Sequence, residues 1–451
     1  MRRVCWFRSD FRLTDNHMLH RVLKDAASGD ELEFVFWLNP NYCEPFETRH
    51  DYFFATMRQF MGELKGNGLG LRVIVADTAE AFVEALGQFD TLYFNAEYVE
   101  PFKQRDDAVI EALGQDVKVI RLLDRHLFAP NAFTKKDGDP YKVYTPFKKA
   151  AYAETPPAPY DVDVTALKQL VATEHVVPAE LRRQFDRCER SWKALGEAAA
   201  KRCLHDFVAN RIDAYDEDRD IPAIAGTSRL SPYLRTGVLS IRTVAEAVLS
   251  APKSSGRDTY YDELLWREFY YMIMVQFPGL KDRPFNDKYK RLDWEDDAEN
   301  FQAWCDGKTG YPIVDAAMRQ LNETGWMHNR LRMIVASFLS KHLLIDWRKG
   351  ERYFEQKLID YEAASNIGGW QWAASVGTDA VPYFRIFNPT TQSEKFDTEG
   401  TFIRKYVPEL ADLDKKSIHF PDLSERDGYI DPIVDHKEAR ARALERFKDA
   451  Q

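Results

Sequence analysis

Short apolar runs recur along the first 124 residues, and the segments between them carry apolar residues at helical spacing. The runs VCWF, EFVFWL, LRVIVA, TLYF and VKVIRLL have the length and composition of buried strands. Residues 50–64 and 78–89 have the spacing of amphipathic helices. Because strand–helix alternation is typical of a parallel, doubly wound sheet, we predict an α/β domain over residues 1–124. No G-x-G-x-x-G follows the first strand, so the pattern lacks a dinucleotide fingerprint.

The pattern changes along the rest of the chain. Residues 125–195 have weak periodicity, and their Pro-rich stretch TPPAPYDVDV predicts an extended interdomain linker. Beyond residue 195 strand signals nearly vanish, which predicts an all-helical domain over residues 196–451. Its clearest helical segments are residues 201–212, 260–277, 312–325, 328–345 and the charged 436–450.

Composition bounds the class of protein. A chain of 451 residues with 45% hydrophobic and 30% charged residues is a globular protein of two or three domains. No run of 18 apolar residues predicts a membrane span, and the first residues do not have a secretory pattern. The five cysteines are scattered and never spaced C-x-x-C, which argues against disulfides and a zinc site. We therefore expect a cytoplasmic protein without a metal.

Charge is distributed unevenly. The net charge of −10 argues against a protein coated with nucleic acid. Residues 1–124 carry −7, whereas residues 319–352 carry +4. The basic segment allows a local basic face on an acidic protein, although a solvated helix surface is the simpler interpretation of the charge alone.

Two segments combine polar groups with a predicted helix start or face. In GTSRLSPYLRTGVLS, Ser231 followed by Pro232 has the pattern of an N-cap and first helical residue. With Thr227 and Ser228 it would bring hydroxyls and free N–H groups together, as a phosphate site does, although plain capping explains the same residues. In DELLWREFYY, Glu263 and Trp266 share one helix face with Arg267, and a Glu263–Arg267 surface pair is the simpler interpretation.

Two further segments combine aromatic and polar residues. In GWMHNRLRM, the residues Trp326, Asn329, Arg330 and Met333 have the spacing of one helix face, which suits the wall of a polar and aromatic cavity. In LIDYEAASNIGGWQW, we predict that Asp360 pairs with Arg332. Gly368 and Gly369 would let a planar ligand approach the backbone beside Trp370 and Trp372.

Taken together and in this order, these segments identify the helical half as a member of the photolyase/cryptochrome family. Residues 226–410 closely resemble the class I cyclobutane pyrimidine dimer photolyases, including GKTGYPIVDAAMRQLNETGWMHNRLRM and GGWQWAASVGTDAVPYFRIFNPTTQSEKFD. The N-terminal half more loosely resembles the family's antenna-binding α/β domain. The resemblance implies an enzyme that repairs dimers in UV-damaged DNA by electron transfer from excited, reduced FAD to a flipped-out dimer.

The resemblance also assigns residues to the two ligands. The FAD ribityl-phosphate part would lie against Tyr215, Thr227, Ser228, Arg229, Leu230 and Ser231. The isoalloxazine would lie against Trp326, Arg332, Asp360, Glu362 and Asn366, with Asn366 facing flavin N5. The dimer pocket would be lined by Glu263, Trp266, Asn329, Met333 and Trp372, and DNA phosphates would be bound by Arg219, Arg330 and Arg385.

The resemblance gives the two tryptophans of GGWQW different roles. Trp372 would stack on the dimer, together with Trp266, and each stacked base contributes about 1–3 kcal/mol. Trp370 would begin an electron-transfer chain that continues through Trp347 and Trp294 to the surface. Glu263 would hydrogen-bond the dimer in its protonated form, which burial favours.

A light-harvesting antenna is also implied, but its identity stays open. Folate-binding members carry an Asn-Asn-Glu-like stretch where this chain has FNAEY, with Ala96 before Glu97. A Cys-Lys pair of those members is replaced by Lys281 and Asp282. A folate, a deazaflavin, a second flavin and an empty antenna site are all compatible with this pattern.

Other members of the family provide the alternative functions. A cryptochrome-type photoreceptor would bind flavin without repairing DNA, but such relatives tend to alter the pocket in which Trp372 and Met333 are kept. Photolyases of (6-4) products carry two His where this chain has Asn329 and Met333, and DASH-type cryptochromes usually have Tyr in place of Trp372. We therefore expect a monomeric enzyme that repairs cyclobutane pyrimidine dimers.

Overall fold

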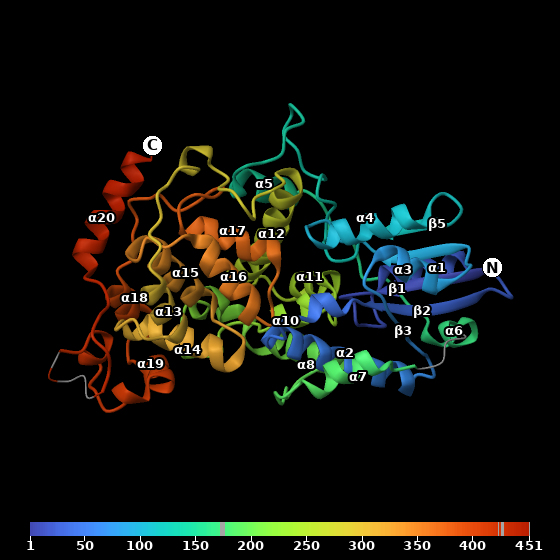
Figure 1. Ribbon diagram of the computed structural model, residues 1–451, viewed down its shortest axis with the longest axis horizontal. Helices are drawn as coiled ribbons and strands as arrows, with labels where there is room; N and C mark the ends of the chain where they lie inside the picture. Colours follow the sequence, from blue (N-terminus) through green and yellow to red (C-terminus); the bar gives the residue numbers. More distant parts are fainter. Residues whose placement is uncertain (172–175, 423, 425–427, 451) are drawn as a thin grey trace. The chain divides into compact units, whose positions relative to one another are not determined.

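The computed structural model describes residues 1–171, 176–422, 424 and 428–450, and the chain divides into two compact units (Figure 1). Unit 1 comprises residues 1–132, 152–210 and 228–253. Unit 2 comprises residues 133–151, 211–227 and 254–451. Within the described residues, no helix is both long and apolar enough to cross a membrane.

Unit 1 is built on a parallel sheet of five strands in the order β3-β2-β1-β4-β5. The five predicted strands are all present. Their bounds are β1 Arg2–Phe7, β2 Glu31–Leu38, β3 Arg72–Val75, β4 Thr91–Asn95 and β5 Lys118–Leu122. Because the first strand lies at the centre and the chain winds outward in both directions, the predicted doubly wound α/β fold is confirmed.

The two faces of this sheet bury different aromatic residues, because successive side chains of a strand point to opposite sides. Trp6 joins the core that helices α3 and α4 complete, where Phe82 lies 5.3 Å from its ring. Phe7 points to the other face, where it meets Phe34 of β2 and Phe60 of α2. Helices therefore cover both faces, which explains why the central strand β1 ends in a continuous apolar run rather than an alternating one.

The helices of unit 1 come from all three of its segments. They are α1 His17–Asp25, η1 Pro40–Cys43, α2 Thr48–Gly66, α3 Ala79–Leu86, α4 Phe102–Leu113, α6 Val164–Leu170, α7 Ala179–Asp186, α8 Gly196–Asn210, α10 Ser231–Arg235 and α11 Ile241–Ser250. Arg242 of α11 is buried and forms ion pairs with Asp15 at 2.8 Å and Asp124 at 2.7 Å. This buried network fastens residues 228–253 to the loops of the sheet.

Unit 2 is helical, as predicted. Its helices are α5 Tyr144–Ala151, η2 Ile212–Ala214, α9 Tyr215–Asp218, α12 Ser255–Gln276, η3 Asp287–Tyr289, α13 Ala298–Asp306, α14 Pro312–Thr324, α15 Asn329–Ser337, η4 Phe338–His342, α16 Trp347–Lys357, α17 Ala363–Ala373, α18 Pro389–Phe396, α19 Thr401–Tyr406, η5 Pro408–Leu410, η6 Ser417–His419 and α20 His436–Asp449. The 22-residue α12 contacts α5, α9 and α17, so it joins segments that lie far apart in the sequence.

Two local predictions differ from the structure. Residues 328–345 do not form one α-helix, because α15 ends at Ser337 and a π-helical turn, η4, follows over Phe338–His342. The weakly periodic segment 125–195 contains three helices that were not predicted, α5, α6 and α7. Residues 155–163 of its Pro-rich stretch do lack helix and strand.

The compact units also partition the chain differently from the predicted ranges 1–124, 125–195 and 196–451. Residues 133–151 belong to unit 2, whereas residues 196–210 and 228–253 belong to unit 1. Compactness and domain identity are different properties, so the predicted domain ranges stay a prediction.

Candidate functional site

Glu263 and Trp266 lie one turn apart on α12, as their spacing predicted. The structure pairs Glu263 with Arg219, at the end of α9, at 2.8 Å between Nη1 and Oε1. Arg267 pairs instead with the buried Glu268, so the simpler interpretation of a Glu263–Arg267 surface pair is wrong. Burial raises the pKa of Glu263, while the Arg219 guanidinium opposes that rise. The site thus holds an acid with competing influences on its protonation.

Trp266 carries a second ring on one of its faces. Tyr144, the first residue of α5, stacks on it with a centroid separation of 3.6 Å and an interplanar angle of 11°. The Tyr144 hydroxyl donates to the Asp262 carbonyl at 2.7 Å, and Phe269 meets Trp266 edge-on. Since one face of the indole is covered, a stacked base has one face of Trp266 left to it. Sequence analysis missed Tyr144 because it lies in the predicted linker.

The residues predicted to share a face with Asn329 do not all lie on its helix. Gly325, with φ of 69°, ends α14, and His328 caps α15 by accepting from the Arg330 N–H. Trp326 lies buried in the turn between these helices, so placing it on the α15 face was wrong. Asn329 is exposed and Met333, one turn later, is partly exposed. These two still share one face of α15.

The predicted phosphate-binding arginines differ in their partners. Arg330 forms a two-point ion pair with Asp220, at 3.1 Å from Nε and 2.6 Å from Nη2, and Arg219 is paired with Glu263. Arg385 lies exposed in the segment between α17 and α18. A phosphate contact by Arg330 or Arg219 would therefore compete with an acidic partner.

The predicted pairing of Arg332 with Asp360 is confirmed. Arg332 Nη2 lies 3.0 Å and 2.8 Å from the two carboxylate oxygens, and its Nε donates to the Met327 carbonyl. Asp360 is buried, whereas Arg332 is partly exposed. The ion pair therefore links α15 to the residues before α17, and the same guanidinium holds the turn before α15.

Glu362 and Asn366 lie at the start of α17. Glu362 is its N-cap and accepts from the Ala364 and Ser365 N–H groups, so its carboxylate is engaged locally. Asn366 donates through Nδ2 to Oε1 of the buried Glu351 at 3.1 Å, and Tyr361 donates to the same oxygen at 2.9 Å. Because its Nδ2 is held by Glu351, the orientation of the Asn366 amide is set. Glu351 was missed, because a Glu inside a charged helical segment carries no distinguishing pattern.

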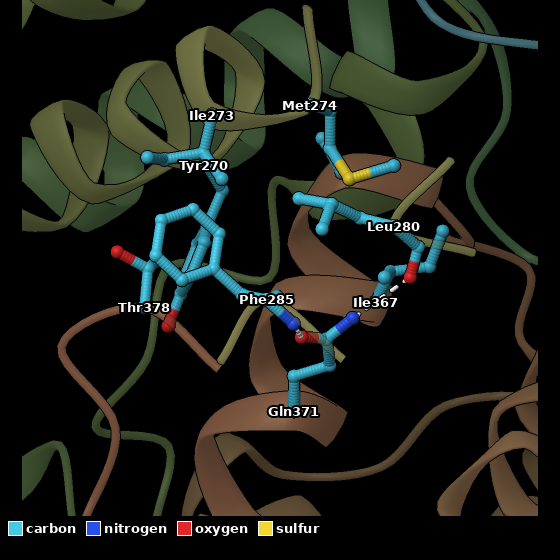
Figure 2. A pocket seen from close by; sticks show the side chains of 10 residues that line it. Tyr270, Ile273, Met274, Leu280, Phe285, Ile367, Gln371 and Thr378 are labelled. Atoms are coloured by element: carbon cyan, nitrogen blue, oxygen red, sulfur yellow. Dashed lines mark hydrogen bonds between the residues drawn. The ribbon is translucent and has the colours of Figure 1, made fainter. Parts of the chain in front are cut away.

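The two tryptophans of GGWQW point to different sides of α17. They are two residues apart, so their directions differ by about 200° on a helix. Trp370 is buried and Trp372 is partly exposed. Gln371 between them anchors the helix: its Nε2 donates to the Leu280 and Arg283 carbonyls, and its Oε1 accepts from the Phe285 N–H (Figure 2). It lines a small apolar pocket with Tyr270, Ile273, Met274, Leu280, Phe285 and Ile367.

The structure places the three predicted electron-transfer tryptophans at different depths. Trp370 and Trp347 are buried, and Trp294 is partly exposed. The ring neighbours of Trp370 are Trp304 at 6.0 Å and Phe354 at 5.1 Å, and that of Trp294 is Phe447 at 6.2 Å. Thus the described residues provide no direct ring contact among the three. Trp304 was missed, since an isolated Trp in a helix reads as core.

The two glycines before Trp370 have different surroundings. A Cβ at Gly368 would lie 2.2 Å from the Tyr270 ring, so helix packing, and not a ligand, requires that glycine. A Cβ at Gly369 would meet no atom within 4 Å. The expectation of an open approach therefore holds at Gly369 alone.

The predicted phosphate-binding stretch divides between the units. Tyr215 and Thr227 lie in unit 2, where the Tyr215 ring meets Tyr260 edge-on and Arg211 donates to the Thr227 carbonyl. Ser228, Arg229, Leu230 and Ser231 lie in unit 1. Ser231 is the first helical residue of α10 and not its N-cap, because the Leu230 carbonyl already accepts from the Leu234 N–H. Arg229 has φ of 57°, a left-handed conformation unusual for a residue other than glycine.

Several features of α17 fit a planar, polar cofactor. Trp370 Nε1 is buried and has no hydrogen-bond partner in the described part of the chain. The side of Gly369 is open, and the Asn366 amide is already oriented by Glu351. A buried donor without a partner costs about 1–3 kcal/mol unless a ligand or water satisfies it.

Comparisons with known proteins agree over the full chain. Residues 260–449 match the family described as the FAD binding domain of DNA photolyase, and residues 3–163 match the family described as DNA photolyase. A deoxyribodipyrimidine photo-lyase of Alkalihalophilus pseudofirmus is 43% identical, over 99% of this chain and 98% of that protein.

Solved structures agree as well. A bacterial class III photolyase from Agrobacterium tumefaciens is 35% identical with a TM-score of 0.90, covering 99% of this chain and 97% of that one. An archaeal photolyase from Sulfolobus tokodaii, solved with two FAD molecules, is 29% identical with a TM-score of 0.86, and the match covers 100% of both chains.

Proposed function

The chain belongs to the DNA photolyase family, and on that premise we propose that it is a deoxyribodipyrimidine photo-lyase that repairs cyclobutane pyrimidine dimers in UV-damaged DNA with light. The observation that carries the proposal is the pair Glu263 and Trp266 on α12, an acid one turn from a stacking ring. A flipped-out dimer needs both a flat surface and a hydrogen-bonding group.

FAD is the cofactor of the proposed reaction, and when bound and reduced it supplies the light-excited electron. We assign its flavin ring to the neighbourhood of Arg332, Asp360 and Asn366. Glu351 holds the Asn366 Nδ2, so the amide oxygen is directed away from that carboxyl group. Trp326 and Glu362 keep their predicted places near the ring, although Glu362 also caps α17. Tyr215, Thr227 and the residues Ser228 to Ser231 keep their predicted phosphate role.

The protein's own residues perform the remaining tasks. Trp266 and Trp372 stack on the extruded bases, and Asn329 and Met333 complete the pocket wall. Glu263 in its protonated form donates to a carbonyl of the dimer, and burial favours that form. Since Arg219 favours the ionised form, its ion pair with Glu263 has to loosen when the dimer enters. Arg219, Arg330 and Arg385 bind the phosphates beside the lesion.

The proposal extends to the oligomeric state, the cellular location and a second chromophore. We infer a monomer that acts in the cytoplasm. A second, light-harvesting chromophore would bind the α/β unit, and the archaeal relative solved with two FAD molecules makes a second flavin one candidate for it.

The test combines flavin analysis with a repair assay. Purified protein should release one FAD per chain on heating. It should restore an oligonucleotide carrying one cyclobutane dimer under near-UV or blue light and not in darkness. A (6-4) product should stay unrepaired, because Asn329 and Met333 offer no acid for the required proton transfer. A folded, FAD-loaded protein that binds dimers but restores none in light would instead favour a photoreceptor.

A further inference from the structure

Lys341 is a fully buried lysine in the π-helical turn η4. Its Nζ donates to the Ser375 hydroxyl at 2.7 Å and to the Arg385 carbonyl at 3.1 Å. Both partners are uncharged, and no ion pair of Lys341 is found among the described residues. A buried ammonium without a carboxylate is costly, so this lysine opposes stability where it stands.

Because Lys341 has no charged partner within the described ranges, no nearby charge offsets the effect of burial on its pKa. Burial alone lowers its pKa to about 7, from an ordinary value of 10.5. The neutral amine still has two N–H groups, enough for both contacts, so either form can hold its partners. An apolar side chain of the same length would pack in the same space without the cost. The two hydrogen bonds are therefore what distinguishes lysine here.

Both partners of Lys341 belong to one segment, residues 374–388, which connects α17 to α18 without helix or strand. Ser375 is the second residue after α17 and has φ of 63°, a left-handed conformation that needs support from its surroundings. Arg385 is exposed near the other end, and its N–H donates to the Pro382 carbonyl. One ammonium thus joins the two ends of this segment.

The middle of the same segment is tied to residues 142–144. Thr378 donates to the Lys142 carbonyl, and the Tyr144 N–H donates to Asp379 at 3.1 Å. The Val376 carbonyl also accepts from the Asn286 N–H at 3.0 Å. The segment is therefore held at several places along its length, and Lys341 provides the attachment nearest to Arg385.

The π-helical turn explains how Lys341 reaches this segment. The extra residue of such a turn rotates the following side chains by about 100° relative to a continuous α-helix. Such turns are frequent at functional sites. Here the turn delivers Lys341 to the segment that follows Trp372.

We propose that Lys341 is a positioning residue that holds the backbone of Arg385, and with it the Arg385 guanidinium, in place for a DNA phosphate. The inference rests on the proposed function, because Arg385 contacts phosphate only if the protein binds DNA. Lys341 itself is buried and touches no DNA. Its contribution to binding is the reduced freedom of the segment from Ser375 to Arg385 before DNA arrives.

The experiment compares three variants in the full-length, FAD-loaded protein. Lys341→Met keeps length and removes both hydrogen bonds. Lys405→Met removes a charge of the same sign from an exposed site on α19, and so controls for net charge. Arg385→Ala removes the proposed phosphate contact. The measurements are melting temperature, flavin content, amide hydrogen exchange of residues 374–388, and affinity for dimer-containing and undamaged DNA over a range of salt.

We expect Lys341→Met to keep its flavin and to melt no lower than wild type, because a costly buried charge has been removed. Amide exchange within residues 374–388 should accelerate without DNA. Affinity for dimer DNA should fall about tenfold, and the slope of log affinity against log salt should shrink by about 1, as expected for one lost phosphate contact. Lys405→Met should change neither exchange nor dimer affinity.

Two results would overturn the proposal. One is unchanged exchange and unchanged dimer affinity in a folded Lys341→Met protein. The other is a parallel loss of melting temperature, flavin and affinity, which would make Lys341 an ordinary core residue. The proposed function fails separately: if Arg385→Ala leaves affinity and salt slope unchanged, Arg385 does not bind phosphate, whatever Lys341 does to the exchange of its segment.

Discussion

Tyr144 stacks on Trp266 with ring centroids 3.6 Å apart and planes 11° from parallel. Tyr144 begins α5, in the segment between the two halves of the sequence, whereas Trp266 lies on α12. A buried tyrosine thus forms the back of a proposed stacking surface and keeps the indole plane from turning.

Tyr144→Leu should therefore weaken dimer binding. An aromatic pair contributes about 0.5–1.5 kcal/mol beyond its buried area, so affinity for dimer DNA should fall about 2- to 12-fold. Tyr144→Phe keeps the stack and loses only the hydrogen bond to Asp262, so its affinity should fall less. Tyr42→Leu, at an exposed tyrosine of unit 1, is the matched control. Stronger dimer binding by Tyr144→Leu would mean that Tyr144 covers the face that the base needs.

Trp370 and Trp372 should separate electron supply from substrate binding. Trp370→Phe should slow photoreduction of oxidised FAD and spare repair once the flavin has been reduced chemically. Trp372→Ala should weaken dimer affinity by about 1–3 kcal/mol and leave photoreduction nearly intact. Absorption spectroscopy measures the rates of photoreduction and of repair, and a melting temperature is measured for each variant. Parallel loss of stability, photoreduction and affinity in both variants would mean that Trp370 and Trp372 are ordinary core residues.

The continuation of the electron path from Trp370 can be tested in the same way. Trp347→Phe should slow photoreduction, as the predicted chain through Trp294 requires. Trp304→Phe is the matched comparison, because Trp304 is equally buried and its ring lies 6.0 Å from Trp370. If only the Trp304 variant is slow, the electron leaves by that ring and the predicted chain is wrong.

Substitutions at Arg330 and at Asp220 should have opposite effects on DNA binding. Arg330→Ala should weaken binding to any DNA and reduce the salt slope by about 1. Asp220→Asn removes the competing partner at 2.6 Å, so it should strengthen binding to damaged and undamaged DNA alike. Filter binding over a range of salt measures both. An unchanged slope in Arg330→Ala would leave Arg330 as a structural partner of Asp220.

Lys341 should make the protein more stable as the pH rises. Its pKa is about 7 in the fold and near 10.5 when exposed, so between these values the unfolded chain binds more protons than the folded one. The free energy of unfolding should then rise with pH by up to about 1.4 kcal/mol per pH unit. Neighbouring His342 does not titrate in this window, because burial lowers its pKa to about 3.

The measurement is denaturant unfolding of wild type and Lys341→Met between pH 7 and pH 10. The difference between the two proteins isolates the lysine, and it should shrink as pH rises. A difference that stays constant with pH would show that Lys341 titrates normally in the fold.

Elements whose residues interact locally could be predicted from the sequence. The five strands and the helices of the second half follow from apolar spacing, because burial of one face or one stripe is written into neighbouring positions. The pairing of Arg332 with Asp360 was also foreseen, since Asp360 stands beside conspicuous polar and aromatic residues. The ligand roles came from resemblance and not from spacing.

Most other contacts between distant segments could not be predicted, because spacing along the chain says nothing of which surfaces meet. Tyr144 lies 122 positions before Trp266, and Arg219 lies 44 before Glu263. Gly368 illustrates the same limit: its sequence suggested room for a ligand, and the fold fills that room with Tyr270.

The sequence by itself determined the five strands, most of the long helices, the two kinds of architecture and the family, since each depends on local pattern or on matching motifs. The tertiary structure alone decided which faces of Trp266, Trp370 and Asn366 are already covered, and by what. Packing is a property of several segments at once, so Glu351 and Lys341 became visible only when their partners, Asn366 and the segment from Ser375 to Arg385, were brought beside them.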